Sequence, residues 1–320
     1  MVKKVVLGIP VYNSEATLTR TLETLVNQDY PIFKIKVFDN QSTDNSQKIV
    51  LDFQKRYPFI ELNINEVNVG AEGNFTCCIQ AAEGDYCALV HSDDLYEKDF
   101  VSKSVAALEN NPQCVAAFCG ALEINDQEKV TGSRFVPNEL TKNDVTVLNA
   151  EELSSLVFKY GNFVTCPSVF ARSNSYCEKI KTWNGREFKS SADLDVWLRL
   201  SQMGSFAFIR KELIRYRVSE ASYSYRIAKK RTTKHDIFLV LDRYKNEKNI
   251  SDYNFLALKD QAIRSLNMIR NKSFAEPFPC EVKFDLGLVW TKMCQSKWHF
   301  KMGVAIIGIH FLTKWYSRAK

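Results

Sequence analysis

Residues 5–13 read VVLGIPVYN, an apolar run that ends abruptly in polar residues. The same change recurs in KIKVFDNQSTD, residues 34–44, and in YCALVHSDD, residues 86–94. Runs of this length and composition predict strands, and in an open α/β sheet ligands bind outside the carboxyl ends of the strands. We therefore expect the three polar clusters to converge on one pocket, which favours a nucleotide site.

The spacing of these runs predicts how the first 125 residues fold. Apolar residues at helical spacing separate the runs, so strands and helices alternate. The expected strands are 4–11, 34–39, 60–65, 86–91 and 115–122. Alternation of this kind implies an α/β fold with a mostly parallel sheet and helices on both faces.

The pattern loosens after residue 125. Residues 126–150 are polar and turn-rich, and we expect them to form a loop that meets a substrate. The other expected elements are a helix at 151–159, a returning strand at 162–172, a helix at 193–203, short strands at 206–209 and 213–218, and long helices near 227–248 and 252–271. The last part of the chain is therefore expected to be helical.

Charge and cysteine content bear on the partners and the compartment. The formal net charge is +6 over 320 residues, which is mild, and no nucleic-acid partner is expected. The nine cysteines include no Cys-x-x-Cys pair, so neither a structural metal site nor a disulfide framework is expected. The first strand follows Met1–Lys4 directly, which leaves no room for a signal peptide. These features predict a reducing, cytoplasmic location.

The C-terminal region carries features of a membrane-surface segment. Residues 302–312 are almost continuously apolar, but they fall short of the ~20 residues that a membrane span needs. Lys301 and Lys314 flank them, so the stretch could lie along a bilayer. Residues 226–234 and 301–320 contain basic residues and no acid, which suits anionic lipid or a phosphorylated acceptor. A buried helix and a solvated helix face explain the same residues, and these readings stay open.

The segment His91-Ser92-Asp93-Asp94 at a strand end suits a divalent metal ion. A hard cation such as Mg²⁺ or Mn²⁺ takes one or two carboxylates and completes its shell with substrate phosphates and water. Asp93 is the first choice of ligand, with Asp94 as a second ligand or a support and His91 as a further candidate. The alternative is that Asp93 and Asp94 cap a helix that begins at Leu95.

The other two clusters offer groups for a nucleobase. Asp39 closes the second strand, where a carboxylate can accept a hydrogen bond from N3 of uracil. Tyr12 can lie against the face of a base, and Asn13 can bond the ligand or its loop. Asn68 and Gly70 form a further strand-end loop, in which Gly70 supplies a positive φ or a close backbone approach. Ordinary turns and an N-cap explain the same residues.

Taken in order, these motifs resemble family 2 glycosyltransferases of the GT-A fold. The resemblance is carried over residues 4–125 by PVYN (10–13), DNQSTD (39–44), NVG (68–70), AEGD (82–85) and SDD (92–94). It resumes at DLDVWLRL (193–200), which is similar to the family's acidic helix facing the acceptor. Tyr216-Arg217, with Ser222 and Ser224, resembles the end of the catalytic domain. Any one of these motifs is weak, but six in order are specific.

The resemblance implies an inverting transfer of a hexosyl or N-acetylhexosaminyl group from a nucleotide-diphosphate sugar, with UDP as the expected nucleotide. Asp193 would be the general base, with Asp195 as the fallback and a helix N-cap as the alternative role. A divalent metal, Mn²⁺ or Mg²⁺, would bind the segment His91 to Asp94. The positions that would bind the donor are Pro10, Tyr12, Asn13, Asp39, Asn68, Gly70, Ser92, Asp93 and Arg217.

The resemblance also implies a domain plan and a setting. Residues 1–225 would form the GT-A domain, with a donor half at 1–125 and an acceptor half at 126–225. Residues 226–320 would form a helical C-terminal region, for which contact with the membrane surface is one of the open readings of its residues. The acceptor would be lipid-linked or a glycan, and the enzyme would serve polysaccharide biosynthesis on the cytoplasmic face of the inner membrane.

Three positions depart from the family pattern. His91 replaces the first acid of the metal motif, Ala192 replaces the acid before Asp193, and Ser219 stands where many relatives carry a histidine. The first two motivate an alternative function, a catalytically degenerate partner subunit that binds a nucleotide or a sugar. A sugar nucleotidyltransferase and a dehydrogenase are disfavoured, because Gly8 stands alone where each needs a Gly-rich loop.

Overall fold

A computed structural model describes residues 2–219, 231–271 and 278–318. The chain forms two compact units. The first comprises Met1–Ser154 and Asn162–Ser219, and the second comprises Ser155–Gly161 and Glu220–Lys320. The expected boundary at residue 225 lies outside the described residues, as do positions 222 and 224, and the division at residue 125 stays a prediction.

One mixed sheet organises the described part of the first unit, and ten strands form it. They are β1 (Val5–Val11), β2 (Lys34–Asp39), β3 (Ile60–Ile64), β4 (Tyr86–Leu89), β5 (Leu95–Tyr96), β6 (Cys114–Ile124), β7 (Val130–Ser133), β8 (Val145–Leu148), β9 (Phe170–Arg172) and β10 (Ser205–Arg217). They follow the order β3-β2-β1-β4-β9-β6-β10-β5, with β7 beside β6 and β8 beside β10. Strands β3, β2, β1 and β4 run parallel, as do β6 and β10.

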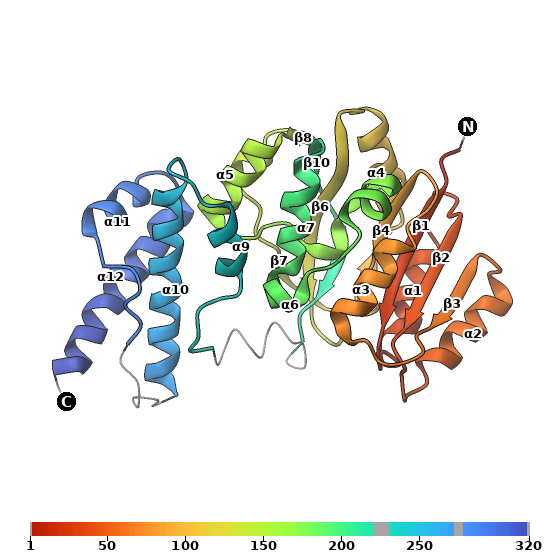
Figure 1. Cartoon of the computed structure of the whole chain (residues 1–320), viewed down its shortest axis with the longest axis horizontal. Helices are drawn as coiled ribbons and strands as arrows, with labels where there is room; N and C mark the ends of the chain where they lie inside the picture. Colours follow the sequence, from red (N-terminus) through yellow and green to blue (C-terminus); the bar gives the residue numbers. More distant parts are fainter. Residues whose placement is uncertain (1, 220–230, 272–277, 319–320) are drawn as a thin grey trace. The chain divides into compact units, whose positions relative to one another are not determined.

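Helices connect the parallel strands and flank the sheet (Figure 1). The first unit contains α1 (Leu18–Val26), α2 (Ser46–Arg56), α3 (Gly70–Gln80), α4 (Phe100–Glu109), α6 (Gly185–Phe188) and α7 (Ala192–Ser201), and α5 (Ala150–Tyr160) continues into the second. Short helical turns lie at Asn138–Leu140, Cys166–Ser168, Ser175–Ile180 and Lys189–Ser191. The expected α/β architecture, a mostly parallel sheet with flanking helices, is confirmed.

The first strand lies in the middle of the parallel part because it is apolar on both faces. All residues of β1 are buried except Pro10, which is partly exposed. Strands of this kind belong in parallel sheets that carry helices on both faces. Helix α1 contributes Leu18, Leu22 and Leu25 to the same core. The polar residues that follow β1 are thereby left at the carboxyl edge of the sheet.

Three stretches fold differently from the expectation. The expected loop at 126–150 contains the short strands β7 and β8. Strand β7 could not be predicted from the sequence, because its four residues are mostly exposed and lack apolar alternation. The strand expected at 162–172 forms only at Phe170–Arg172. The two strands expected at 206–209 and 213–218 are one strand, β10, whose register shifts around Glu212 absorb the polar break between them.

The second unit is helical in its described residues. It holds α9 (Ile237–Tyr244), α10 (Ile250–Arg270), α11 (Leu286–Met293) and α12 (Lys297–Arg318). Helix α12 packs against α10 and α11 around Phe255, Val289 and Ile306 (Figure 1). The helix expected at 252–271 is confirmed as α10, and the one expected at 227–248 is shorter in its described part, α9. No described helix is long and apolar enough to cross a membrane.

Candidate active site

The three polar clusters meet at the carboxyl edge of the parallel strands, as the sequence predicts. Strand β1 lies between β2 and β4, so the segments that follow these strands are neighbours. Asn13 Oδ1 accepts a hydrogen bond of 2.8 Å from the Thr43 N–H, which joins the ends of β1 and β2. Ser14 Oγ lies 2.8 Å from Ser92 Oγ, which joins the ends of β1 and β4. One continuous polar edge results.

Asp39 ends β2 with its carboxylate buried. Its Oδ1 accepts hydrogen bonds from the Ser42 N–H at 3.0 Å and from Gln47 Nε2 at 2.7 Å. The first of these bonds is the turn that was the alternative role for Asp39. Its Oδ2 is buried and has no hydrogen-bond partner among the described residues. Because a buried polar atom without a partner costs free energy, Oδ2 is available to a donor that a ligand supplies.

Asn40 belongs to this edge, although the sequence reasoning did not single it out. Its buried side chain ties the end of β2 to the loop after β3. Its Nδ2 donates to Asn68 Oδ1 at 2.9 Å, and its Oδ1 accepts from the Val69 N–H at 2.9 Å. Gly70 follows with a φ of +74° and open space where a Cβ would lie. Gly70 therefore supplies the expected positive φ, and a close approach of a ligand to its backbone stays a prediction.

Pro10 and Tyr12 frame the end of β1. Pro10 pairs with Phe38 in the sheet, and Tyr12 is 51% exposed just beyond the strand. An exposed aromatic ring at a strand end is free to lie against a flat ligand. The structure places both residues at the predicted edge, and their contact with a donor stays a prediction.

His91, Asp93 and Asp94 form a cluster that we call the metal cluster. Each residue offers one ligand atom, and these atoms lie within 4.8 Å of one another. Asp94 Oδ2 and His91 Nε2 are buried and lack hydrogen-bond partners among the described residues. Strand β5 follows directly, and the next helix begins only at Phe100. The alternative reading of the two aspartates as helix caps is therefore wrong.

Burial sets the protonation of the metal cluster. It raises the pKa of Asp94 well above the usual range, and the charge of Asp93 adds to the rise. Burial lowers the pKa of His91, which keeps the imidazole neutral and able to bind a metal. Carboxylate oxygens suit Mg²⁺ or Mn²⁺, and three protein donors leave positions for phosphate and water. The donor set therefore fits a divalent cation that a substrate diphosphate completes.

Helix α1 and its N-cap residue hold the metal cluster through three threonines, Thr17, Thr21 and Thr24, which we call the α1 hydroxyl row. Hydrogen bonds run from Thr17 Oγ1 to the Ser92 carbonyl (3.0 Å), from Thr21 Oγ1 to the Asp94 carbonyl (2.9 Å) and from the Tyr96 N–H to Thr24 Oγ1 (3.2 Å). A spacing of three and four residues places these side chains on one face of the helix. The sequence reasoning found the apolar face of α1 and missed this polar one.

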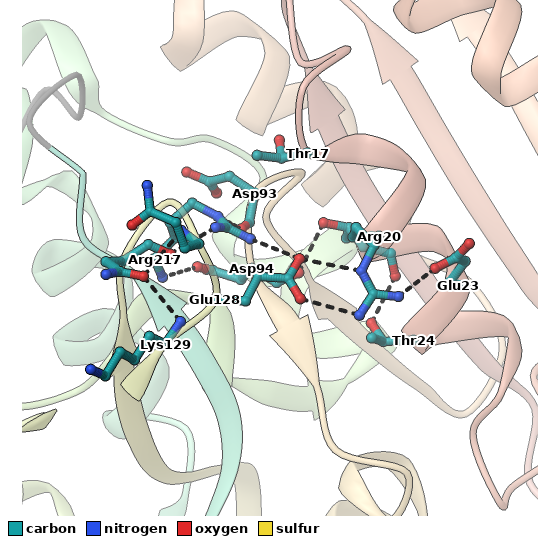
Figure 2. Close-up of polar contacts among 12 residues, drawn as sticks. Thr17, Arg20, Glu23, Thr24, Asp93, Asp94, Glu128, Lys129 and Arg217 are labelled. Carbon is teal, nitrogen blue, oxygen red and sulfur yellow. Dashed lines mark hydrogen bonds and ion pairs between the residues drawn. The ribbon is translucent and has the colours of Figure 1, made fainter. Parts of the chain in front are cut away.

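Arg217, at the end of β10, also holds the metal cluster (Figure 2). Its N–H donates to Asp94 Oδ1 at 2.7 Å, and its Nε donates to the Asp93 carbonyl at 2.8 Å. Glu128 lies 3.6 Å from Arg217 Nη2 and also accepts from Arg20 of α1 at 3.1 Å (Figure 2). Arg217 is 7% exposed. These contacts make it a support of the metal cluster, and its contact with donor phosphates stays a prediction.

Asp193 lies in the first turn of α7, two residues after the N-cap position Ser191. Its alternative role as the N-cap is therefore wrong. The carboxylate accepts hydrogen bonds from Asn162 Nδ2 at 2.9 Å and from the Leu194 N–H at 2.7 Å. Burial raises the pKa of Asp193 to about 6, although both hydrogen bonds oppose the rise. A carboxyl group whose pKa is near neutral is suited to proton transfer.

Asp193 and the metal cluster act on the same neighbouring side chains. Burial raises the pKa of the Cys166 thiol, and the charges of Asp193 and Asp94 both add to the rise. The Arg134 guanidinium partly offsets the effect of burial on the pKa of both carboxyl groups. It lies 5.2 Å from the centre of the Tyr216 ring. The sequence reasoning missed Arg134 because it stands alone in the expected loop, with no motif around it.

The fold and the site together define an α/β protein in which a candidate metal cluster and the carboxyl group of Asp193 act on the same neighbouring side chain, Cys166. The family model described as glycosyl transferase family 2 matches residues 7–217, so the chain belongs to this family and is a glycosyltransferase. EpsE of Bacillus subtilis (strain 168), a glycosyltransferase by name, is 26% identical over 223 residues, which are 69% of this chain and 74% of EpsE.

A second relative is WfgD of Escherichia coli, which is named a UDP-Glc:alpha-D-GlcNAc-diphosphoundecaprenol beta-1,3-glucosyltransferase. It is 28% identical over 136 residues, which are 42% of this chain and 52% of WfgD. The match therefore spans about half of that protein. The name of WfgD gives it a UDP-linked donor and a lipid-diphosphate acceptor.

Solved structures share the expected GT-A fold. Residues 1–349 of S. aureus TarS in complex with UDP match with a TM-score of 0.58 at 17% identity, over 99% of this chain and 92% of that one. The mannosyltransferase PcManGT from Pyrobaculum calidifontis, in complex with GDP-Man and Mn²⁺, matches with a TM-score of 0.55 at 15% identity, over 98% and 88% of the two chains. At these identities the likeness shows the fold alone.

Proposed function

We propose that this glycosyltransferase moves a sugar from a UDP-sugar to a hydroxyl of a lipid-linked or glycan acceptor, with inversion at the anomeric carbon. The observation that carries the proposal is the shared centre of Asp193 and the metal cluster, beside strand ends that suit a nucleotide. A direct displacement at the anomeric carbon needs both a base and a group that offsets negative charge. The attacking hydroxyl must lose a proton, and the leaving diphosphate gains charge.

The nucleobase binds at the ends of β1 and β2. The buried Asp39 Oδ2, which has no partner among the described residues, accepts the N3–H of uracil, and the exposed Tyr12 ring lies against the base. Asn40 holds the Asn68 loop beside them, so the pocket wall is fixed before the donor arrives. UDP as the nucleotide follows the UDP complex of TarS and the UDP-Glc donor in the name of WfgD.

The metal cluster would hold a divalent cation, Mn²⁺ or Mg²⁺, through Asp93 with Asp94 and His91. Such a cation offsets the negative charge of the leaving diphosphate when it is bound. The protein itself positions the ligand atoms. The α1 hydroxyl row and Arg217 fix the backbone that carries the ligand atoms, so these atoms keep their spacing when the substrate binds.

Asp193 takes the proton from the acceptor hydroxyl. Its pKa of about 6 lies below neutral pH, so the carboxylate is mostly ionised there, and the rise above the ordinary value makes it basic enough to accept a proton. Asp195, the fallback, is buried in an ion pair of 2.8 Å with Arg199 Nε, so its charge is already matched. We therefore assign the base to Asp193.

The setting that we propose is the cytoplasmic face of the inner membrane, in polysaccharide assembly. The catalytic GT-A domain would span 1–225, with donor and acceptor halves that divide at residue 125, and 226–320 would be the C-terminal region. The lipid-diphosphate acceptor in the name of WfgD supports an acceptor at a membrane. The alternative of a degenerate partner subunit rests on His91 and Ala192, and it predicts nucleotide binding without turnover.

Calorimetric titration with UDP, GDP and CMP, each with and without Mn²⁺, tests the proposal. We expect UDP to bind most tightly, to bind more tightly with Mn²⁺, and to lose more than about tenfold in affinity in Asp39→Ala. The control Asp52→Ala removes an exposed carboxylate that pairs with Lys55 at 2.8 Å, and it should bind UDP normally. Absence of nucleotide binding would contradict the proposed function, and binding without transfer of any sugar would favour the degenerate subunit.

A further inference from the structure

The outward side of α12 has a composition that a water-exposed helix seldom carries. Five large apolar side chains on it are 38–62% exposed, namely Phe300, Val304, Phe311, Leu312 and Trp315, and we call them the outer face of α12. At 3.6 residues per turn, four of the five fall within about 60° of one another around the helix axis. The opposite side, with the buried His299 and Ile306, packs within the helical unit.

The charged side chains of α12 have one sign. Lys297 and Lys301 are exposed at the start of α12, and Lys314 is exposed near its end. No Asp or Glu occurs in the chain after Asp285. Helix α11 of the same unit adds Leu286 and Trp290, which are 55% and 62% exposed. Helix α12 therefore presents apolar side chains framed by cations, and the exposed Asp285 precedes Leu286 of α11.

We propose that the outer face of α12 docks the protein on an anionic lipid surface. Apolar side chains enter the boundary between head groups and acyl chains, and lysines at both ends of the face bind lipid phosphate. Tryptophan is favoured at this boundary because its ring is apolar and its N–H is polar. The helix lies on the surface with one side in lipid and the other packed on α10 and α11, so it is neither the wholly buried helix nor the solvated face considered from sequence.

A second copy of the chain is a poorer occupant of the same face. In a parallel pairing of two α12 helices, Lys297 and Lys301 would meet their own copies. In an antiparallel pairing they would meet Lys314. Both arrangements bring like charges together without an acid to balance them, whereas an anionic surface is complementary to all of them. The positive charge around the outer face of α12 therefore favours docking on anionic lipid over pairing with a second copy of the chain.

Docking deepens the proposed function, because a lipid-linked acceptor would then meet the enzyme at the surface that holds it. That consequence rests on the proposed function, but the docking does not. Vesicle binding is measured without donor or acceptor, so failure of docking and failure of transfer are seen in separate experiments.

Co-sedimentation of the full chain with two kinds of vesicle tests the docking surface. One kind is pure phosphatidylcholine, and the other is phosphatidylcholine mixed with phosphatidylglycerol. We expect binding to the mixed vesicles that falls as salt rises, because head-group attraction is screened within a Debye length. Equal binding to both kinds would overturn the assignment to an anionic surface.

A matched pair of variants tests the apolar side of the proposal. Phe311→Ser/Trp315→Ser should lower the partition onto mixed vesicles by about tenfold or more, because two side chains no longer enter the lipid. The control Leu51→Ser/Ile64→Ser removes two side chains of 47% and 50% exposure from the first unit, and it should bind normally. UDP binding and circular dichroism verify that both variants are folded.

A second pair tests the charges. Lys297→Gln/Lys301→Gln should weaken binding to mixed vesicles and flatten its salt dependence, at roughly 1 kcal/mol or fivefold per lysine. The control Lys48→Gln/Lys142→Gln removes two other exposed lysines and should change neither.

Light scattering of the protein alone completes the test. We expect the Phe311→Ser/Trp315→Ser variant to have the same mass as the parent protein. If the parent were a dimer that this variant dissociates, and mixed vesicles did not bind, the outer face would be an interface between copies and the proposal would be overturned.

Discussion

The metal cluster and Asp193 are two acidic regions of the candidate site, each at least partly buried, and the fold holds them in different ways. Asp94 is fixed by the Arg217 N–H at its carboxylate and by Thr21 at its carbonyl. Asp193 accepts one side-chain hydrogen bond, from Asn162, and its pKa is about 6. Groups that bind a metal must keep their positions, whereas a base must change its charge in every turnover. The supports differ in origin, since those of Asp94 lie 73 and 123 residues away in the chain, whereas Asp193 also accepts a hydrogen bond from the adjacent Leu194 N–H.

The largest effect is expected from Asp193→Asn, which removes the base and keeps the shape. The transfer rate should fall by about 10²- to 10⁴-fold, while UDP and Mn²⁺ binding stay unchanged. Stability should not fall above pH 6. The folded pKa of about 6 lies above the ordinary 3.8, so the folded state holds its proton longer than the unfolded one, and stability contributed by Asp193 is lost as pH rises between these values. Transfer assays and thermal unfolding at pH 5 and pH 8 measure both effects.

The variant Asp195→Asn serves as the control for that experiment. It breaks the buried ion pair with Arg199, so it should lower the melting temperature at neutral pH. Transfer at the parental rate in Asp193→Asn would contradict the assignment of the base, and a loss of transfer in Asp195→Asn without loss of stability would move the assignment to Asp195.

Changing Asp93 to alanine and changing Asp94 to alanine should have different effects on stability. Asp93→Ala should abolish the gain in UDP affinity that Mn²⁺ gives and leave the melting temperature close to that of the parent, because its carboxylate is the more exposed. Asp94→Ala leaves the buried Arg217 N–H without its acceptor and should cost about 1–3 kcal/mol of stability as well. Calorimetry with Mn²⁺ and denaturant unfolding distinguish the two. Equal loss of stability in both would show that the cluster is held as one block.

The α1 hydroxyl row offers a smaller change in the same segment. Thr21→Val keeps the shape of a fully buried side chain and removes its hydrogen bond to the Asp94 carbonyl, at a cost of about 1 kcal/mol or more. The apparent affinity for Mn²⁺ should weaken, and the pH dependence of transfer should stay unchanged. Thr19→Val, two residues earlier on the same helix, is the matched control. No effect of Thr21→Val on Mn²⁺ affinity would limit the row to a role in folding.

The sequence predicts the polar edge at the carboxyl ends of the parallel strands well, because the signals for this edge are local. An apolar run that ends in polar residues, as at Asp39 or Asp93, predicts both a strand and the edge of the sheet at which the polar side chains lie. The order of the motifs then identifies the family. The signal for the helix start near Asp193 is also local, and the structure adds the hydrogen-bond partners of its carboxylate.

The supports of the site could not be predicted, because they come from distant parts of the chain. Thr21 and Asp94 are 73 residues apart, and Arg217 and Asp93 are 124 apart. Nothing near Thr21 in the sequence distinguishes it from the solvated threonines of an amphipathic helix. Arg134 lacked a signal for a different reason, since it follows the exposed edge strand β7, whose polar residues read as a loop. Pairing of non-local segments creates these contacts, and periodicity within one segment does not report it.

The pH dependence of transfer gives the smallest effect and the sharpest separation of the two regions. A single base with a pKa of about 6 makes kcat/KM rise with pH through about 6 and then level off. Asn162 Nδ2 donates a hydrogen bond of 2.9 Å to the Asp193 carboxylate and so favours the charged form of this group. Asn162→Leu removes that donor and should move the rising limb to higher pH by up to about one unit. Thr21→Val should leave the limb in place, because the α1 hydroxyl row does not touch Asp193. The opposite result would be a rising limb of the pH profile that moves in Thr21→Val and stays in place in Asn162→Leu. It would show that the titrating group belongs to the metal cluster, and the assignment of the base to Asp193 would be wrong.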